Sequence, residues 1–330
     1  MFEALEADQR QDRITLRFLA AHGDVNVRGD SVPAGRVLEW IDKAGYACAV
    51  GWSQSYCVTA YVGNVHFTHP IRPGALVQVH ARVILTGRTS IHILVTVEAS
   101  DVRERRYMPA MHCILVFVAV DDDSCPQPVP EWTPSSVTDF ELQQLAAERV
   151  APRRAIQREM ASQQYTSDHT VPESVLRFLA APGDSNWGGN AHGGTVMRWI
   201  DEAAYSCAAA WSSAHAVAVY AGGIQFHAPI RIGDVVELRA RLIHTTPRSM
   251  HLAVLVRAAP PGKPPVLTTR SMTVFADVYG GEAQPVPELR VVSDEDRRLS
   301  RHACLLMDLR KGIAPLPPSA QFFGNRPLAL

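Results

Sequence analysis

One short stretch of the chain holds most of the residues whose types and spacing could do chemistry. Asn186 is followed by His192, Gly193 and Gly194, and Asp201 lies seven residues after Gly194. Glycines just before a helix leave backbone N–H groups unpaired, and such groups can bind an anion or polarise a carbonyl. A carboxylate about two helical turns further on can act as a general base or a nucleophile. The stretch therefore indicates an oxyanion hole or an anion-binding cradle, with the Asn186 amide as a possible further donor.

Each of these features also has a simpler interpretation, and the residues alone leave both open. Asp201 can be a surface residue, because charged side chains are usually exposed. The glycines can form a tight loop, and His192 can make a local hydrogen bond only. Sequence patterns of nucleotide-binding loops, serine-hydrolase elbows and HExxH zinc sites do not occur in the chain.

The chain contains an internal duplication, which supplies a second copy of the candidate residues. LRFLAAHGDVN at 16–26 corresponds to LRFLAAPGDSN at 176–186, and WIDKAGYACAVGW at 40–52 corresponds to WIDEAAYSCAAAW at 199–211. Asn26 and Asp42 are thus the counterparts of Asn186 and Asp201. The repeat predicts a first unit at 14–131, a connecting helix and linker at 132–173, a second unit at 174–290, and a helix with a proline-rich tail at 291–330.

Within each unit, the hydrophobic period predicts the elements that must position these residues. Residues 36–52 have helical spacing and no proline, whereas 77–83, 91–97 and 236–242 alternate with a period of two. We therefore expect an α+β fold in which one long helix, rich in small residues, is wrapped by antiparallel strands. Two such units can join their sheets edge to edge, like an isologous dimer. The charged stretches after each unit are expected to be solvated or to pack on a neighbouring subunit.

Composition excludes several classes of partner. The net charge is -1, with 32 Lys and Arg against 33 Asp and Glu, so nothing favours nucleic acid or an anionic membrane surface. A secretory signal and membrane-spanning runs are not expected, which predicts a cytoplasmic protein without membrane insertion. The six cysteines show no CxxC spacing, so no metal site is expected.

Taken together, several motifs resemble those of one family. They are DxNxxGxxxGG at 184–194 with the helix Asp after it, FxxPIRxG at 67–74 and 226–233, GRTSIH at 87–92, and the repeated PVPE. The combination resembles the double-hotdog acyl-CoA thioesterases, and it covers most of residues 14–290. The resemblance implies a tandem hotdog fold and hydrolysis of fatty acyl-CoA to free acid and CoA. It implies no cofactor, because CoA is part of the substrate.

The resemblance also implies which residues form the sites. In this family the helix-start glycine polarises the thioester carbonyl, an Asn assists, and an Asp from the other unit activates water or attacks. Carried over, one site would combine Asp42 with Asn186, His192, Gly193 and Gly194, and the other would combine Asn26 with Asp201. Arg88 and Ser90, and in the second copy Arg248 and Ser249, would bind CoA through charge-assisted hydrogen bonds. A homo-oligomer, such as a trimer of chains, is implied as well.

The first copy departs from the family pattern at the glycine turn. It carries one extra residue, Pro33 has no N–H to donate, and Ala34 replaces a glycine. We therefore expect the Asn26 and Asp201 site to have a poorer oxyanion hole and Asp42 to be the base of the better site.

Two other functions remain open from the sequence. A hotdog hydratase or dehydratase ranks low, because His192 has no copy in the first unit. A non-catalytic acyl-CoA sensor or carrier is favoured by the damaged turn and by Ala218 in place of Thr59.

Overall fold

In the computed structural model, the described residues are 10–100, 106–186, 188–313 and 316. The first unit contains β1 (Arg13–Leu19), η1 (His22–Asp24), α1 (Ala34–Ser53), β2 (Cys57–Val62), β3 (Val65–His66), β4 (Leu76–Thr86), β5 (Ser90–Ser100) and β6 (Met108–Ala119). The connector forms α2 (Val137–Glu148) and α3 (Val150–Ser162). The second unit contains β7 (Glu173–Leu179), η2 (Pro182–Asp184), α4 (Gly193–Trp211), β8 (Ala216–Phe226), β9 (Val235–Thr246), β10 (Ser249–Ala259), β11 (Val266–Tyr279) and β12 (Glu282–Ala283), and α5 (Asp294–Lys311) follows.

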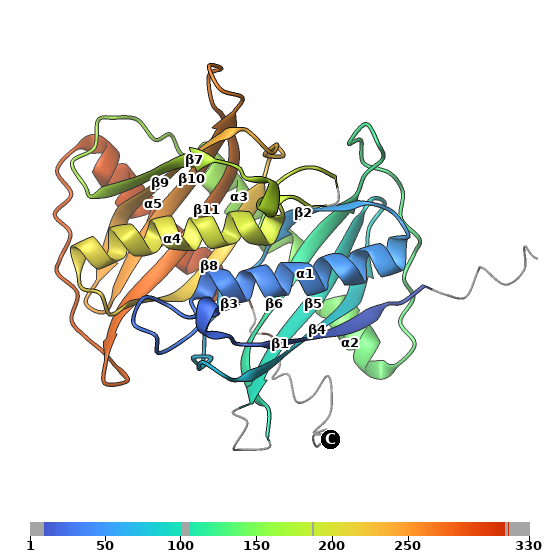
Figure 1. Cartoon of the computed structure of the whole chain (residues 1–330). Coiled ribbons are helices and arrows are strands. Elements are labelled where there is room, and N and C mark those ends of the chain that lie inside the picture. Colours follow the sequence, from blue (N-terminus) through green and yellow to red (C-terminus); the bar gives the residue numbers. More distant parts are fainter. Residues whose placement is uncertain (1–9, 101–105, 187, 314–315, 317–330) are drawn as a thin grey trace, which may run out of the picture.

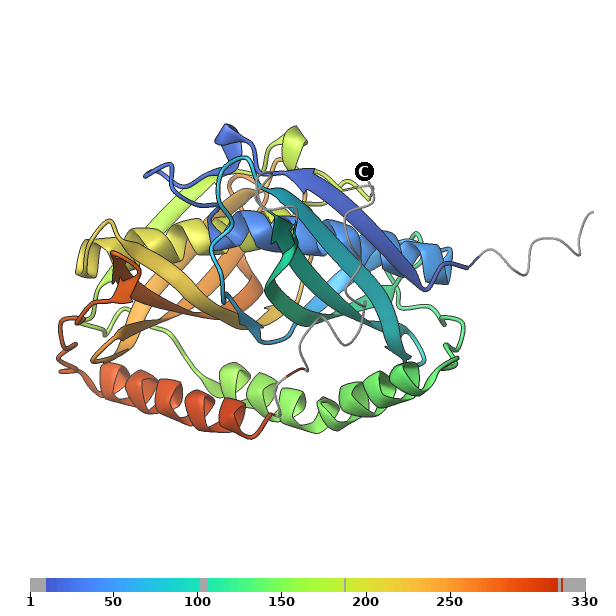
Figure 2. The same ribbon diagram turned by 90° about the horizontal axis from the view of Figure 1, so that it is seen from below.

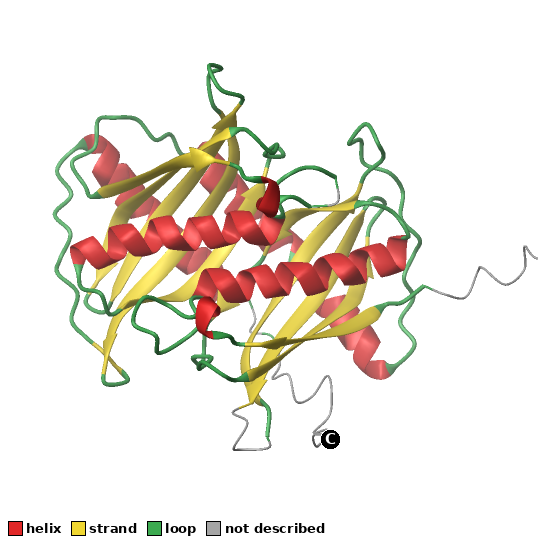
Figure 3. Cartoon of the chain, viewed as in Figure 1, coloured by secondary structure: helices red, strands yellow, loops and turns green. Residues whose placement is uncertain are grey.

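The strands of both units form one continuous antiparallel sheet (Figures 1 and 3). Its order is β1-β4-β5-β6-β2-β8-β11-β10-β9-β7, with β3 paired to β8 and β12 paired to β11. The units meet where β2 pairs with β8, with Tyr61 opposite Gln225 and Val62 opposite Ile224. The expected α+β architecture of two hotdog units joined edge to edge is confirmed.

The long helices α1 and α4 lie side by side on the inner face of the sheet (Figure 1). They run antiparallel, because the first turn of each faces the second turn of the other. A Cβ added to Gly35 would lie 2.8 Å from the Cα of Arg198, and one added to Gly194 would lie 2.8 Å from the Cα of Glu39. Glycine at these two positions therefore lets the backbones of the two helices touch. This contact brings the middle of each helix to the start of the other.

The outer face of the sheet is covered by α2, α3 and α5 (Figure 2). The expectation that the charged stretches are solvated or pack on another subunit is therefore wrong, and the connector is two helices instead of one. The apolar side chains of these helices are few but suitably spaced: Leu142 and Ala146 pack on Ile84 and Leu94, while Ile156, Met160, Leu299, Ala303 and Leu306 pack with Ile243, Ala253 and Met272.

Two buried ion pairs fix α2 and α5 to the sheet. Arg82 on β4 pairs with Asp139 on α2, and Arg241 Nη1 on β9 lies 2.7 Å from Glu295 Oε1 on α5. These contacts explain why helices with charges on most faces still pack on their own sheet. No helix in the described part of the chain is long and apolar enough to cross a membrane.

Candidate active site

The antiparallel contact of α1 and α4 places Asp42 of the first unit at the start of α4 in the second. Asp42 is buried, at 0% exposure. Its Oδ2 accepts a hydrogen bond of 2.7 Å from the Gly194 N–H, and its Oδ1 accepts one of 2.7 Å from Thr59 Oγ1 on β2. A carboxylate is thus held between the units by donors from both.

His192 is the N-cap residue of α4 and the third partner of this carboxylate. Its Nδ1 lies 2.8 Å from Asp42 Oδ2 and 3.2 Å from the Gly194 N. Burial lowers the pKa of His192, but the hydrogen bond to Asp42 and the charge of Asp42 outweigh burial, so the pKa is raised above its ordinary value. The pair can therefore hold a proton beside a buried carboxylate.

Gly193, the first residue of α4, has no room for a side chain. A Cβ here would lie 2.8 Å from Thr59 Oγ1 and 3.0 Å from Asp42 Oδ2, so only glycine fits. Because Asp42 already holds the Gly194 N–H, the remaining N–H suited to a carbonyl is that of Gly193, which has no partner within the helix. Of the two expected glycines, Gly194 therefore positions the carboxylate, and Gly193 can polarise the carbonyl of a substrate.

Asn186 organises the loop before α4. Its side-chain oxygen accepts hydrogen bonds of 2.9 Å from the Gly188 N–H and 3.1 Å from the Asn190 N–H. Among the described residues, Asn186 is not hydrogen-bonded to Asp42. Its contact with the carbonyl of a substrate stays a prediction.

Two tyrosines near this loop were not singled out from the sequence. A Cβ on Gly188 would lie 2.5 Å from the Tyr56 hydroxyl, which is buried and has no hydrogen-bond partner among the described residues. Tyr56 contacts Tyr46 at a ring distance of 6.5 Å, and Tyr46 contacts His192 at 6.0 Å. The only sequence signal was that position 56 differs between the copies, with His215 in the second.

The second carboxylate, Asp201, lies in the reciprocal position but has fewer partners. Its Oδ2 accepts a 2.8 Å hydrogen bond from the Gly35 N–H, and its exposure is 8%. Burial raises the pKa of Asp201 to about 6, against the opposing effect of the Gly35 N–H and with a small contribution from Glu202. Pro33 stands where the first site has His192, and Ala218 stands where it has Thr59.

Polar side chains of the loop before α1, near the second carboxylate, already have hydrogen-bond partners within the protein. Asn26 Nδ2 donates to Asp30 Oδ1 at 2.7 Å and to Ser31 Oγ at 3.1 Å, so its amide donors are occupied. Arg28, the counterpart of Gly188, has its Nη1 3.3 Å from the Ala214 oxygen and 3.1 Å from His215 Nδ1. A guanidinium therefore lies where the first site has only a glycine.

The missing N–H of Pro33 does not make the second site weaker, contrary to the expectation from the sequence. Pro33 does lack an N–H, but its counterpart His192 donates its own backbone N–H to the Asp184 oxygen at 2.9 Å. That donor is thus not available in the first site either, and Ala34 keeps an N–H at the position of Gly193. The two sites differ in their side chains: His192, Thr59 and Gly188 in one, and Pro33, Ala218 and Arg28 in the other.

The residues expected to bind CoA lie at the tips of two hairpins. Arg88 is in the β4–β5 turn and is exposed, and Ser90 is the first residue of β5. Thr59 lies opposite Phe117, which lies opposite Ile91, so this turn is at the same end of the sheet as Thr59.

The second hairpin repeats this arrangement. Ala218 lies opposite Phe275, which lies opposite Met250. Met250 follows Ser249, the first residue of β10, and Arg248 in the β9–β10 turn. Arg248 is exposed, and Ser249 Oγ lies 3.2 Å from His251 Nε2. Each hairpin is therefore two strands away from one candidate site.

The cysteines at matching helix positions are structural. Cys48 and Cys207 are buried, and burial raises the pKa of their thiols to about 12 and about 11. Because the thiolate is the nucleophilic form, neither is suited to catalysis at neutral pH.

Comparison with known proteins gives a consistent family. A model of the thioesterase superfamily matches residues 32–105 and 188–264, one segment in each unit. Mouse acyl-coenzyme A thioesterase 11 is 26% identical over 249 residues, which are 71% of this chain and 41% of that protein. The human cytosolic acyl coenzyme A thioester hydrolase is 26% identical over 297 residues, which are 83% of this chain and 77% of that protein.

A bacterial relative is matched over nearly its whole length. The acyl-CoA thioester hydrolase YciA of Salmonella typhimurium is 33% identical over 124 residues, which are 36% of this chain and 92% of that protein. The chain thus spans less than half the length of the mouse protein but almost all of the bacterial one. With two hotdog units in one sheet and a matched segment in each, the chain belongs to the thioesterase superfamily, among the double-hotdog acyl-CoA thioesterases.

Proposed function

We propose that the protein hydrolyses fatty acyl-CoA to free fatty acid and CoA at the site that contains Asp42. One observation carries this proposal: a fully buried carboxylate of one unit is held by the Gly194 N–H of the other and by Thr59, next to His192. The human and bacterial relatives are named as acyl-CoA thioester hydrolases, which supports the same substrate class.

The geometry suits a two-part division of the chemistry. The Gly193 N–H would donate a hydrogen bond to the thioester oxygen as negative charge develops there, as oxyanion-hole donors do. Asp42 would take a proton from the attacking water, or attack the carbonyl carbon itself, with Thr59 and the Gly194 N–H holding its orientation. His192 would hold the proton that the departing CoA sulfur requires. One water is consumed, the C–S bond breaks, and a carboxylic acid and a thiol leave.

The remaining substrate contacts follow from the hairpins. Arg88 and Ser90 would bind the CoA phosphates for the first site, and Arg248 and Ser249 are their counterparts for the second. Asn26 and Asp201 would form at most a weakened site, because Arg28 lies beside His215 there. We therefore propose one competent site per chain.

We further propose a metal-independent enzyme without a cofactor, acting in the cytoplasm as a homo-oligomer such as a trimer. Turnover that survives exhaustive dialysis against a chelator would support metal independence. The native mass measured by light scattering tests the oligomeric state. The name of the human relative, a cytosolic hydrolase, supports the location.

The experiment that tests the proposed function is thiol release in ¹⁸O-labelled water, with acyl-CoAs from acetyl to palmitoyl. Hydrolysis predicts equal amounts of CoA and free acid, with one ¹⁸O in each carboxylate, and the best chain length identifies the preferred substrate. A hydratase would instead add water to an enoyl-CoA without releasing thiol. Saturable acyl-CoA binding with no thiol release from any substrate would contradict hydrolysis and favour the sensor or carrier.

A further inference from the structure

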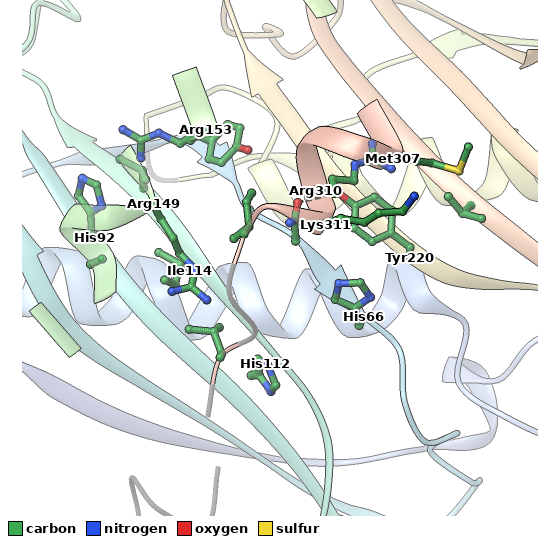
Figure 4. A pocket seen from close by; sticks show the side chains of 18 of the residues that line it. His66, His92, His112, Ile114, Arg149, Arg153, Tyr220, Met307, Arg310 and Lys311 are labelled. Carbon is green, nitrogen blue, oxygen red and sulfur yellow. Dashed lines mark hydrogen bonds between the residues drawn. The ribbon is translucent and has the colours of Figure 1, made fainter. Parts of the chain in front are cut away.

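One cavity of the molecule lies apart from the candidate active site. It has a volume of about 470 Å³ and lies on the outer face of the sheet, where the two units join, under α2, α3 and the end of α5 (Figure 4). The strand residues that line it, such as His92 and Ile114, alternate with Ile91 and Leu115, which pack on the inner side. The sheet therefore separates this cavity from Asp42.

Both halves of the chain contribute the same three residue types to this cavity. The first half provides Tyr61, His92 and Arg153 of α3, and the second half provides Tyr220, His251 and Arg310 of α5. Arg153 stacks over Tyr61 at 5.4 Å from the ring centre, and Arg310 stacks over Tyr220 at 4.3 Å. The catalytic side chains differ between the copies, but this set of three is present in both.

The charges that face the cavity all have one sign. Arg149, Arg153, Arg310 and Lys311 line it, and none of the described lining residues is Asp or Glu. Nε of Arg153, and Nε and Nη2 of Arg310, are buried without a hydrogen-bond partner among the described residues. Unpaired buried guanidinium N–H groups are costly, so a bound oxyanion between them would be strongly favoured.

The histidines of the cavity add hydrogen-bonding groups without adding charge. Burial, with the nearby Arg153, lowers the pKa of His92 to about 4. Burial, with His244 and Arg310, lowers that of His251 to about 3. The pKa values of His66 and His112 are also lowered, chiefly by burial. At neutral pH, the positive charge therefore comes from the arginines and the lysine alone.

The rest of the wall is mostly apolar. Ile114 and Val116 from β6, Val274 from β11 and Met307 from α5 belong to it, and Asn64 adds one amide. Ligand sites of this size typically combine apolar walls with a few polar groups that fix the orientation. A small inorganic anion would leave this apolar surface uncovered, whereas an uncharged lipid would leave the arginines unpaired.

We propose that this cavity binds an amphipathic anion, an acyl or alkyl chain with a carboxylate or phosphate head, with the head between Arg153 and Arg310. Ligand binding here would connect α3 and α5, the helices that cover the junction of the two units. The binding does not depend on hydrolysis at Asp42.

Isothermal titration calorimetry with four probes tests this proposal. Dodecanoate and dodecyl phosphate, below their micelle concentrations, carry the two candidate heads; dodecanol lacks the charge, and inorganic pyrophosphate lacks the chain. We expect at least one of the two amphipathic anions to bind at least tenfold more tightly than dodecanol and pyrophosphate, and the tighter of the two identifies the head group. Dodecanol or pyrophosphate binding as tightly as the tighter of the two amphipathic anions would overturn the proposal.

Matched variants locate the binding. The double variant Arg153→Gln, Arg310→Gln should weaken binding at least tenfold, whereas Arg154→Gln, Arg301→Gln, exposed positions on the same two helices, should not change it. Circular dichroism checks that each variant is folded. Asp42→Asn should leave this binding unchanged, because the site lies across the sheet. Loss of binding in Asp42→Asn but not in the arginine variant would assign the ligand to the active site and contradict the proposal. Such a result would leave the proposed hydrolysis at Asp42 untouched.

Discussion

At the residue scale, equivalent aspartates have acquired different surroundings. Asp42 is held by two donors and faces His192, whereas Asp201 has a single backbone donor among the described residues. The difference depends on single side chains, because the backbone N–H groups at the two helix starts are equivalent. Substitutions at these positions should therefore separate catalysis from stability.

The hydroxyl of Thr59 is the simplest of these side chains to remove. Thr59→Val keeps the shape but leaves Asp42 Oδ1 without its 2.7 Å donor. A hydrogen bond to a charged group contributes about 1.5–3 kcal/mol, so we expect kcat to fall roughly 10- to 100-fold. Steady-state kinetics measure this, with Ala218→Thr at the matching position as the control that should lose nothing. An unchanged kcat in Thr59→Val would show that the hydroxyl does not position the base.

The carboxyl of Asp201 should affect stability in a pH-dependent way. Its folded pKa is raised to about 6 from 3.8, so the folded protein binds more protons than the unfolded chain between these values. Stability therefore falls as pH rises through this window, and above it the full penalty is on the order of 3 kcal/mol. Asp201→Asn removes the penalty while its side-chain oxygen still accepts the Gly35 N–H.

Thermal or denaturant unfolding of Asp201→Asn at two pH values measures this effect. We expect the variant to be more stable than the wild type near pH 8, with the gain decreasing toward pH 4.5. A gain of the same size at both values would mean that ionisation of Asp201 is not its cause.

At the element scale, the close contact between α1 and α4 determines the site. Gly35→Ala would place a Cβ 2.8 Å from both the Arg198 Cα and the Asp201 Cβ. Since neither backbone can move freely in the core, we expect a loss of about 1–3 kcal/mol of unfolding free energy. Gly51→Ala is the control on the same helix, because its Cβ meets nothing closer than 3.5 Å. It should be neutral or stabilising by up to about 1 kcal/mol. Equal effects of the two changes on unfolding would contradict the packing argument.

Sequence pattern predicted the elements of each unit well, because local period specifies them. The helix expected at 36–52 is α1, Ala34–Ser53, and the alternating segments are strands. The outer helices were misjudged, because Leu142 and Ile156 stand among charges, and the partners of those charges, such as Arg82, come from distant strands. Similarly, the pairing of Asp42 with the second unit came from the family resemblance, since spacing alone does not show which helix start an Asp faces.

At the scale of the whole molecule, the candidate active site exists only because the units are joined. Asp42 and Thr59 come from the first unit, and His192 and Gly193 come from the second. In the described part of the chain, short pairings of β2 and β3 with β8 join the two sheets, and α1 packs closely against α4. The cavity on the outer face lies at this same junction.

Dividing the chain tests this dependence. We expect residues 1–167 and 168–330, cut in the exposed loop before β7, to regain thiol release when co-expressed and to show none when expressed alone. Activity of the second half alone, measured at equal concentration of folded protein, would mean that Asp42 is not required.

The central claim is tested most directly by the kcat for acyl-CoA hydrolysis in Asp42→Asn and Asp201→Asn, each with a wild-type circular dichroism spectrum. Loss of a general base typically costs about 10²- to 10⁴-fold, and the account predicts this loss for Asp42→Asn, with at least about half of the activity retained in Asp201→Asn. Equal losses in both variants, or the larger loss in Asp201→Asn, would contradict it.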